Sequence, residues 1–358
     1  MITRKFIKAV LMQYSGIVGA GMFILPYLFY HSNFHFAVVW LIIITFLMMF
    51  LNQMYLEIIL DTPGDHQLSG YARIYLGRFF QYLVMFDMLV LGLGAASAYV
   101  HLGSNFLNLF IPSLSNFNCQ LIFLFSLSLF HLCQFKVINK VSHYLPLINI
   151  IIIIMLFSAT LQIPFNVNIS APLSNFTFFG GLIFALTGFV IIPEVKAVFG
   201  EKKPRRLVWA SRVGLLLASL TYLIFIVSII LLSGSDLTSD SITGIFHRSA
   251  LLGQILAALG FFLTFKACLN FILTLKELFF RDLHFNVKKS ATLSILVPFL
   301  SLFLARFSFI NIITYTGSFT VVISASIIIC VKLKLWITKS KKLKKSLILS
   351  RLLANISH

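Results

Sequence analysis

The chain has 358 residues, of which 59% are hydrophobic and 11% charged, and its mean hydropathy is +0.98. A soluble domain is about 45–50% apolar and about 25% charged, so this composition excludes a water-soluble fold. The net charge of +18 comes from Lys and Arg in short segments between apolar runs, without an aromatic-interleaved basic domain, which argues against nucleic-acid binding.

Ten apolar runs follow one another along the chain. Crossing the roughly 30 Å hydrocarbon core takes about 20 residues per helix, so each run is a candidate span. The first run continues past signal-peptide length without a small-residue cleavage site, and we expect it to remain as a helix. We therefore predict an all-α membrane protein with about ten transmembrane helices, at residues 8–30, 36–58, 80–109, 118–134, 138–161, 174–198, 207–233, 249–279, 290–305 and 308–336.

Basic residues predict how these helices are oriented. If the N-terminus is cytoplasmic, the cytoplasmic segments hold nearly every Lys and Arg, which leaves Arg248 and Arg306 outside and Lys266 within a helix. The positive-inside rule then predicts an inner-membrane protein with both termini in the cytoplasm. The basic segment 337–358 is either a charge cluster with a frayed tail or a helix on an anionic lipid surface.

Ten spans divide into five and five, and an odd number per half gives the second half the opposite orientation, as in inverted-repeat transporters. The predicted repeats cover residues 1–161 and 174–336, followed by the basic tail 337–358. The first helix of each half is interrupted by glycine and proline, in GIVGAGMFILP (16–26) and FFGGLIFALTGFVIIP (178–193). Corresponding interruptions point to a binding site near the bilayer midplane.

These interruptions suit an amino acid as ligand. Glycine lets the backbone leave helical geometry, and the freed N–H and C=O groups must be satisfied by protein, ligand, ion or water. A zwitterionic amino acid offers a carboxylate to one half-helix N-terminus and an ammonium to freed carbonyls. The alternative is that the glycines only allow close helix packing. The predicted substrate-binding residues are Gly16, Ile17, Val18, Gly19, Ala20 and Gly21, then Phe184, Ala185, Leu186, Thr187 and Gly188, with Tyr99 added by position.

Two groups of motifs carry a resemblance to known proteins. GIVGAGMFILPY, YLEIIL and GDHQLSGYARIYLG resemble bacterial permeases related to the hydroxy and aromatic amino acid permeases. FGGLIFALTGFVIIPEV with the following EKKPRR is similar to the sixth helix and loop of the wider amino acid, polyamine and organocation superfamily. The resemblance implies a LeuT-type fold with broken helices 1 and 6, and cation-coupled transport of aromatic or other neutral amino acids by alternating access. Many relatives have eleven or twelve helices, whereas ten are predicted here.

Ionisable residues inside the spans are candidates for coupling and gating. In LeuT-type folds the first and eighth helices hold a sodium ion, and some relatives replace it with a lysine from the fifth helix. Here the fifth helix offers His143 instead, while Lys266 lies within the eighth beside Thr264. A lysine there would repel sodium and could alternate between charged and neutral forms, so we predict proton rather than sodium coupling. Lys266 could instead pair with Asp87 or line a watery vestibule.

Two acidic residues are the second choices for carrying the proton. Asp87 lies about two turns into the third helix, and no motif accompanies it. Glu194 matches the superfamily's Pro-Glu pair, and the resemblance implies a role in the cytoplasmic gate. The alternative for Glu194 is an interfacial ion pair with Lys196.

Other classes of function are less well supported by the sequence. The chain has no HExxH motif, nucleophile–base pairing or phosphate-binding loop, so we do not expect an enzyme. The four cysteines lie far apart, so neither a metal site nor a disulfide framework is indicated. No cofactor is expected. The main alternative is an amino-acid-sensing receptor of the same fold, like the spore germinant receptor subunits. The expected partners are an amino acid, a coupling cation and the lipid bilayer, and the sequence leaves the oligomeric state open.

Overall fold

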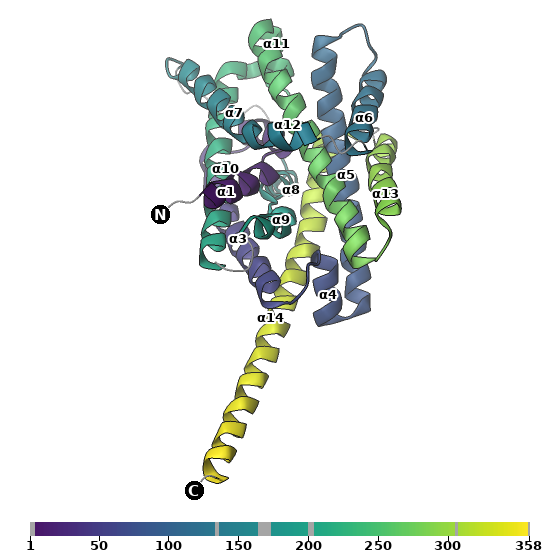
Figure 1. Ribbon diagram of the computed structural model, residues 1–358. Helices are drawn as coiled ribbons and strands as arrows, with labels where there is room; N and C mark the ends of the chain where they lie inside the picture. The colour runs from purple at the N-terminus through teal and green to yellow at the C-terminus, as the bar shows by residue number, and fades with distance from the viewer. Residues whose placement is uncertain (1–3, 133–135, 164–172, 200–203, 305–306, 357–358) are drawn as a thin grey trace.

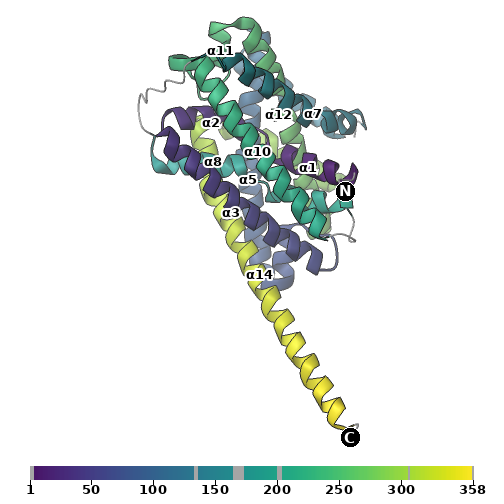
Figure 2. The same cartoon turned by 90° about the vertical axis from the view of Figure 1, so that its left-hand side faces the viewer.

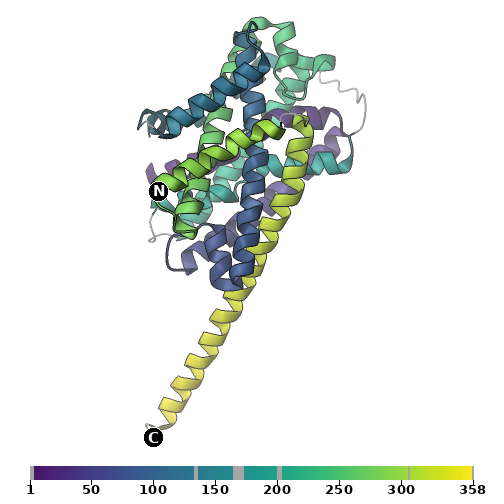
Figure 3. The ribbon, with the colours of Figure 1, turned by 90° about the vertical axis from the view of Figure 1, so that its right-hand side faces the viewer.

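The computed structural model describes residues 4–132, 136–163, 173–199, 204–304 and 307–356, and every regular element in these ranges is helical. Figures 1, 2 and 3 show a helix bundle from which the end of α14 projects. The elements in chain order are α1 (Arg4–Ile17), α2 (Gly21–Tyr30), α3 (Phe34–Asp61), α4 (Leu68–Leu76), α5 (Arg78–Phe110), α6 (Asn116–Leu132), α7 (Lys136–Thr160), α8 (Asn175–Leu186), η1 (Phe189–Ile191), α9 (Ile192–Phe199), α10 (Pro204–Ser233), η2 (Gly234–Asp236), α11 (Thr243–Arg248), α12 (Ala250–Glu277), η3 (Leu278–Asp282), α13 (Val287–Leu300), η4 (Ser301–Leu304) and α14 (Phe309–Ile356).

Most of these helices are long and apolar enough to cross a membrane. Within the described ranges seven helices meet this condition, and the bent pair α1–α2 makes an eighth. Helix α6 and the stretch Tyr144–Thr160 of α7 are apolar but shorter. Large apolar side chains such as Phe50, Phe86 and Phe319 are exposed on the outer faces, as expected where lipid covers a helix. The chain is therefore a multi-pass membrane protein.

The helices pack in two groups, which come from both halves of the chain. The first group joins α1, α2 and α3 to α8, α9 and α10, whereas the second joins α5 and α6 to α12 and α13. Helix α14 packs against α8 of the first group and against α5 of the second. The space between the two groups is therefore lined by segments that are far apart in sequence.

The first predicted interruption is a break between α1 and α2. Residues 18–20 leave the helix, and the two pieces meet at an angle of 60°. Pro26, which cannot donate a backbone hydrogen bond, lies inside α2 rather than at the break. Glycine, not proline, therefore marks the position where the helix bends.

The second predicted interruption lies between α8 and α9. Helix α8 ends at Leu186, residues 187 and 188 are non-helical, and the short 3₁₀ turn η1 leads into α9. Phe184, Ala185 and Leu186, which the sequence placed in the interruption, form the last turn of α8. The break is thus shorter than predicted.

The segment after α3 and the basic segment near the C-terminus both contain helix. A turn follows α3, and the chain then forms the short helix α4. Residues 337–356 of the basic segment continue α14 as a helix, and this end of α14 projects from the bundle in Figure 1.

Candidate functional site

The two breaks lie side by side and help to enclose a cavity of about 60 Å³. One buried water takes about 10–15 Å³ when volume is measured in this way, so several waters would fit. The walls are formed by the α1–α2 break, the end of α8 with η1, one face of α5 and one face of α12.

Most of the residues that the sequence proposed for substrate binding line this cavity. The lining includes Gly16, Ile17, Gly19, Ala20, Gly21, Tyr99, Phe184 and Thr187. The other four predicted residues lie outside the cavity lining. Val18, Ala185 and Leu186 are buried in the hydrophobic core, and Gly188 packs against Ile17 and Gln13.

Helix α12 contributes a wall that the sequence analysis largely overlooked. Ala267, Asn270, Phe271 and Thr274 all line the cavity. Their spacing of three and four residues places them on one helix face. The same rule relates Leu91, Ala95 and Tyr99 on α5, so periodicity anchored on Tyr99 could have found this wall.

The glycines at the breaks serve different purposes, as the position of a hypothetical Cβ atom shows. At Gly21 it would lie 2.5 Å from Ala185 Cα, and at Gly16 it would lie 2.7 Å from Ile191 Cγ2. These two glycines allow the broken helices to touch. At Gly19 the nearest atoms are Ala267 Cβ at 3.1 Å and Tyr99 Cε1 at 3.4 Å. Gly19 therefore keeps open the gap between α1 and the α5 and α12 walls.

A side chain from α1 also contacts the second break. Gln13 Nε2 donates to the carbonyl oxygen of Gly188 at 3.0 Å, and Gln13 is fully buried. A buried carbonyl that leaves a helix needs such a donor. This contact holds the end of α1 against the non-helical residues that precede η1.

Lys266 reaches from α12 to the last turn of α1. Its ammonium donates to Ser15 Oγ, two residues before α1 ends. The C-terminal end of a helix carries a partial negative charge of about half an electron, which favours a cation nearby. The lysine predicted as the coupling group therefore lies beside the cavity, where Ser15 is part of the lining.

Asp87 and Thr264 lie apart from the cavity lining. Asp87 is buried on α5 and accepts from Ser324 Oγ of α14 at 2.6 Å. Thr264 is buried, and its hydroxyl donates to Gly260 of its own helix at 2.9 Å. His143 lies on α7, but its side chain falls outside the described residues.

Glu194 has different surroundings from those expected. Lys196, its alternative partner, pairs with Asp65 at 3.2 Å. Glu194 interacts electrostatically with Arg281 and Glu277 of the α12–η3 segment, and its Oε2 is buried without a hydrogen-bond partner among the described residues. Glu194 on α9 is therefore close enough to the end of α12 to be attracted by Arg281 and repelled by Glu277.

Comparison with known proteins identifies the family. A model described as the tryptophan/tyrosine permease family matches residues 2–353. The chain belongs to this family. No curated protein matches the permease in sequence.

Solved structures resemble the permease in fold. The inward-facing conformation of Mhp1 is 12% identical, with a TM-score of 0.67 over 90% of this chain and 75% of that one. MhsT in complex with L-phenylalanine is 14% identical, with a TM-score of 0.66 over 91% and 88%. A manganese transporter of Eremococcus coleocola is 13% identical, with a TM-score of 0.66 over 97% and 90%. Mhp1 and MhsT are LeuT-fold transporters. The permease is accordingly an amino acid transporter of the secondary type rather than an enzyme.

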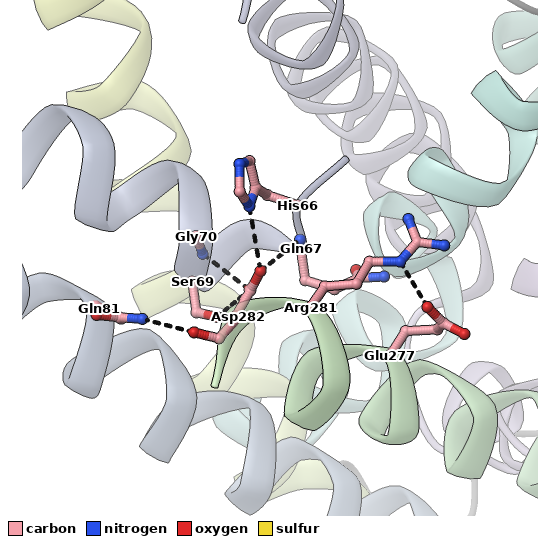
Figure 4. A network of polar contacts seen from close by, with 8 residues as sticks. All are labelled: His66, Gln67, Ser69, Gly70, Gln81, Glu277, Arg281 and Asp282. Carbon is pink, nitrogen blue, oxygen red and sulfur yellow. Dashed lines mark hydrogen bonds and ion pairs between the residues drawn. The ribbon is translucent and has the colours of Figure 1, made fainter. Parts of the chain in front are cut away.

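The permease also contains a polar cluster that the sequence analysis missed. Asp282, at the end of η3, accepts hydrogen bonds from Ser69 Oγ, from Gly70 N at 2.9 Å and from Gln67 N at 3.3 Å, and His66 Nδ1 lies 3.6 Å away. Figure 4 shows this carboxylate at the start of α4. A carboxylate at a helix N-terminus satisfies amides that lack partners and is favoured by the helix dipole.

Further contacts surround this cluster, which we call the Asp282 clamp (Asp282 with His66, Gln67, Ser69 and Gly70). Gln81 Nε2 of α5 donates to the Asp282 carbonyl at 3.3 Å, and Arg281 pairs with Glu277 at 2.6 Å, as Figure 4 also shows. Burial raises the pKa of Tyr71 on α4 to about 12. Through the hydrogen bonds of Asp282 to α4 and of Gln81 to Asp282, the clamp holds α4 against the end of α12 and against α5 in the second group.

Proposed function

We propose that the permease binds an aromatic amino acid in the cavity between the two broken helices and carries it across the membrane by alternating access. The observation that carries this proposal is that two breaks from opposite halves of the chain line one cavity. The family description supports tryptophan or tyrosine as substrate. The aromatic side chains of Tyr99, Phe184 and Phe271 in the lining offer the substrate ring stacking or edge contacts, worth about 0.5–1.5 kcal/mol per aromatic pair.

The backbone at the breaks provides groups for the amino acid head. Helix α2 begins at Gly21, so the amides of Ala20 and Gly21 lie at a positive helix end, which suits a carboxylate. Helix α8 ends at Leu186, so the carbonyls of its last turn, near Phe184, suit an ammonium. A carbonyl oxygen has two lone pairs, so the carbonyls near Phe184 can accept from the ammonium as well as from their partners within the protein.

We propose that the coupling cation is a proton and that Lys266 carries it. The ammonium contacts Ser15 in the last turn of α1, the region where a sodium ion would otherwise be attracted by the helix end. Two unit charges 4 Å apart repel by about 4 kcal/mol at an effective dielectric constant of 20. A charged Lys266 therefore disfavours sodium, and its deprotonation on one side of the membrane would let a pH gradient drive transport. Asp87 and Glu194 remain the second choices.

We also propose ten spans arranged as two inverted repeats, residues 1–161 and 174–336. Counting α6 and α7 as spans gives ten. The two packing groups support this arrangement, because each combines corresponding spans of both halves.

We propose an inner-membrane location with both termini in the cytoplasm. Basic residues of α14 pair with acids at the end of α3, Lys332 with Glu57 at 2.6 Å and Lys339 with Asp61 at 2.7 Å. Asp65, just beyond, pairs with Lys196. These contacts support placing the three segments on one side, and the positive-inside rule makes that side cytoplasmic.

Uptake by proteoliposomes tests the proposed substrate. The purified full-length permease is expected to accumulate labelled tryptophan or tyrosine from a panel of the twenty amino acids, and small neutral amino acids are expected to compete weakly. A panel in which the aromatic amino acids give neither uptake nor counterflow, while another class does, would contradict the substrate assignment.

A further inference from the structure

One hydroxyl group contacts both breaks. Tyr222 Oη, on α10, lies 2.9 Å from the carbonyl oxygen of Ile17 and 3.0 Å from that of Ala185. Both distances are those of ordinary hydrogen bonds. The Tyr222 side chain is fully buried, and it does not line the cavity. Its hydroxyl therefore donates to a carbonyl of each broken helix.

The surrounding carbonyls explain why this donor is needed. The last four carbonyls of a helix lack partners within the helix. In α8, Ile183 O accepts from Thr187 Oγ1 at 2.8 Å, and Phe184 O accepts from Thr187 N at 3.2 Å. The next carbonyl, Ala185 O, accepts from Tyr222. The last carbonyl of α1, Ile17 O, accepts from the same hydroxyl.

The electrostatic situation is unusual, because two helix C-termini converge on one neutral group. Each end carries about half a negative charge, and in transporters of this kind such ends commonly coordinate a sodium ion or proton. A phenol has a single proton, so Tyr222 shares it between the two carbonyls. The hydroxyl thereby lies between the negative ends of the two helices, at Ile17 and Ala185.

We propose that Tyr222 is a positioning residue for transport, whose hydroxyl ties the ends of α1 and α8 together so that the two broken helices present the binding cavity as one unit. This inference rests on the proposed binding site and adds a residue outside it. Without the donor, the arrangement that binds substrate is less populated, and the apparent affinity falls in proportion to that population. Once substrate is bound, its own head group holds the two ends, so turnover at saturation is preserved.

The test compares Tyr222→Phe with the wild type in tryptophan and tyrosine counterflow by proteoliposomes. The expected result is a KM at least tenfold higher, with Vmax within about twofold of the wild type. Ser228→Ala is the matched control, because Ser228 is buried on the same helix and its hydroxyl donates to Ile224 of α10 itself. Its KM and Vmax are expected to stay within about twofold of the wild type.

A purely structural role gives a different result. A smaller folded fraction lowers Vmax and leaves KM unchanged, and this pattern in Tyr222→Phe would overturn the proposal. If that variant does not fold, 4-aminophenylalanine and 4-methylphenylalanine at position 222 provide the comparison at nearly equal volume. The amino side chain, which retains a donor, is expected to keep a KM near the wild-type value, and the methyl side chain is expected to raise it. Equal KM values for the two would also overturn the proposal.

A parallel variant separates this inference from the binding site on which it rests. Gly19→Val changes the cavity wall itself. An unchanged KM in Gly19→Val would remove the proposed binding site. An impaired Gly19→Val beside a wild-type KM in Tyr222→Phe would leave the site standing and remove only the role of Tyr222.

Discussion

The cavity and the Asp282 clamp both lie at helix ends, but they differ in how many hydrogen bonds satisfy the polar groups of those ends. At the clamp, one carboxylate satisfies several donors at the start of α4, and a Cβ on Gly70 would lie 2.7 Å from Asp282 Oδ1. A side chain at Gly70 would therefore collide with the carboxylate. At the cavity, the lining is small or apolar apart from a few hydroxyls and one amide, and the helix ends are linked by single donors such as Gln13.

This difference indicates which part of the permease is able to change shape. A region whose polar groups are all paired at close range resists rearrangement, so the clamp is expected to keep α4, α5 and α12 together. The breaks, joined by single hydrogen bonds worth about 0.5–1.5 kcal/mol each, are expected to move. The following variants test this contrast, from the largest expected effect to the smallest.

Lys266→Met is expected to have the largest effect. It removes the proposed proton carrier beside the first break, so accumulation driven by a pH gradient should be abolished, while counterflow, which needs no net proton movement, is retained in part. The measurement is tryptophan accumulation and counterflow in the same proteoliposomes. Lys276→Met, at the end of the same helix, serves as control and should keep accumulation near wild type. Accumulation that persists in Lys266→Met would assign the proton to another group.

Substitutions at Gly19 should weaken substrate binding in a graded way. The alanine Cβ would lie 3.1 Å from Ala267 Cβ, so Gly19→Ala fits after a small shift, whereas the valine methyl groups extend between α1 and the α5 and α12 walls. We expect KM for tryptophan to rise about threefold for alanine and at least tenfold, about 1.4 kcal/mol, for valine. Equal affinity in all three proteins would show that the wall at Gly19 does not contact substrate.

Asp282→Ala is expected to destabilise the fold while changing substrate affinity least. Hydrogen bonds to a charged group contribute about 1.5–3 kcal/mol, and their loss should lower the thermal unfolding midpoint by several degrees, with KM within about threefold of the wild type. Asp236→Ala is the control, because Asp236 pairs with Arg248 where both side chains are about half exposed and such pairs stabilise little. A tenfold rise in KM with an unchanged midpoint would show that the clamp shapes the cavity rather than holding the scaffold.

Much of the helical arrangement could be predicted from the sequence, because hydropathy depends on local composition. Each predicted apolar run coincides with a helix or helix pair, and both interruptions contain a break. The residues of the site were harder to predict from the sequence. The sequence alone does not distinguish Gly19 from Gly21. Only the structure shows that Gly19 faces Ala267 and Tyr99, whereas Gly21 packs against Ala185.

Long-range partners were the features that the sequence could not reveal. Asp282 accepts hydrogen bonds from residues more than 200 positions away in the sequence. No local sequence pattern at the end of α12 indicates these bonds. In the sequence, Tyr222 is one polar residue within an apolar run. Its proposed role depends on two backbone carbonyls that folding brings together. The α12 wall is the exception, since helical periodicity alone could have identified it.

The central claim is that a proton, carried by Lys266, drives transport through the cavity between the two breaks. The most direct measurement is tryptophan uptake by wild-type proteoliposomes under an imposed inward pH gradient without sodium, compared with an inward sodium gradient at equal pH. If Lys266 carries the coupling proton, we expect accumulation with the pH gradient and only equilibration with the sodium gradient. Strict dependence on sodium, with no response to the pH gradient, would contradict it.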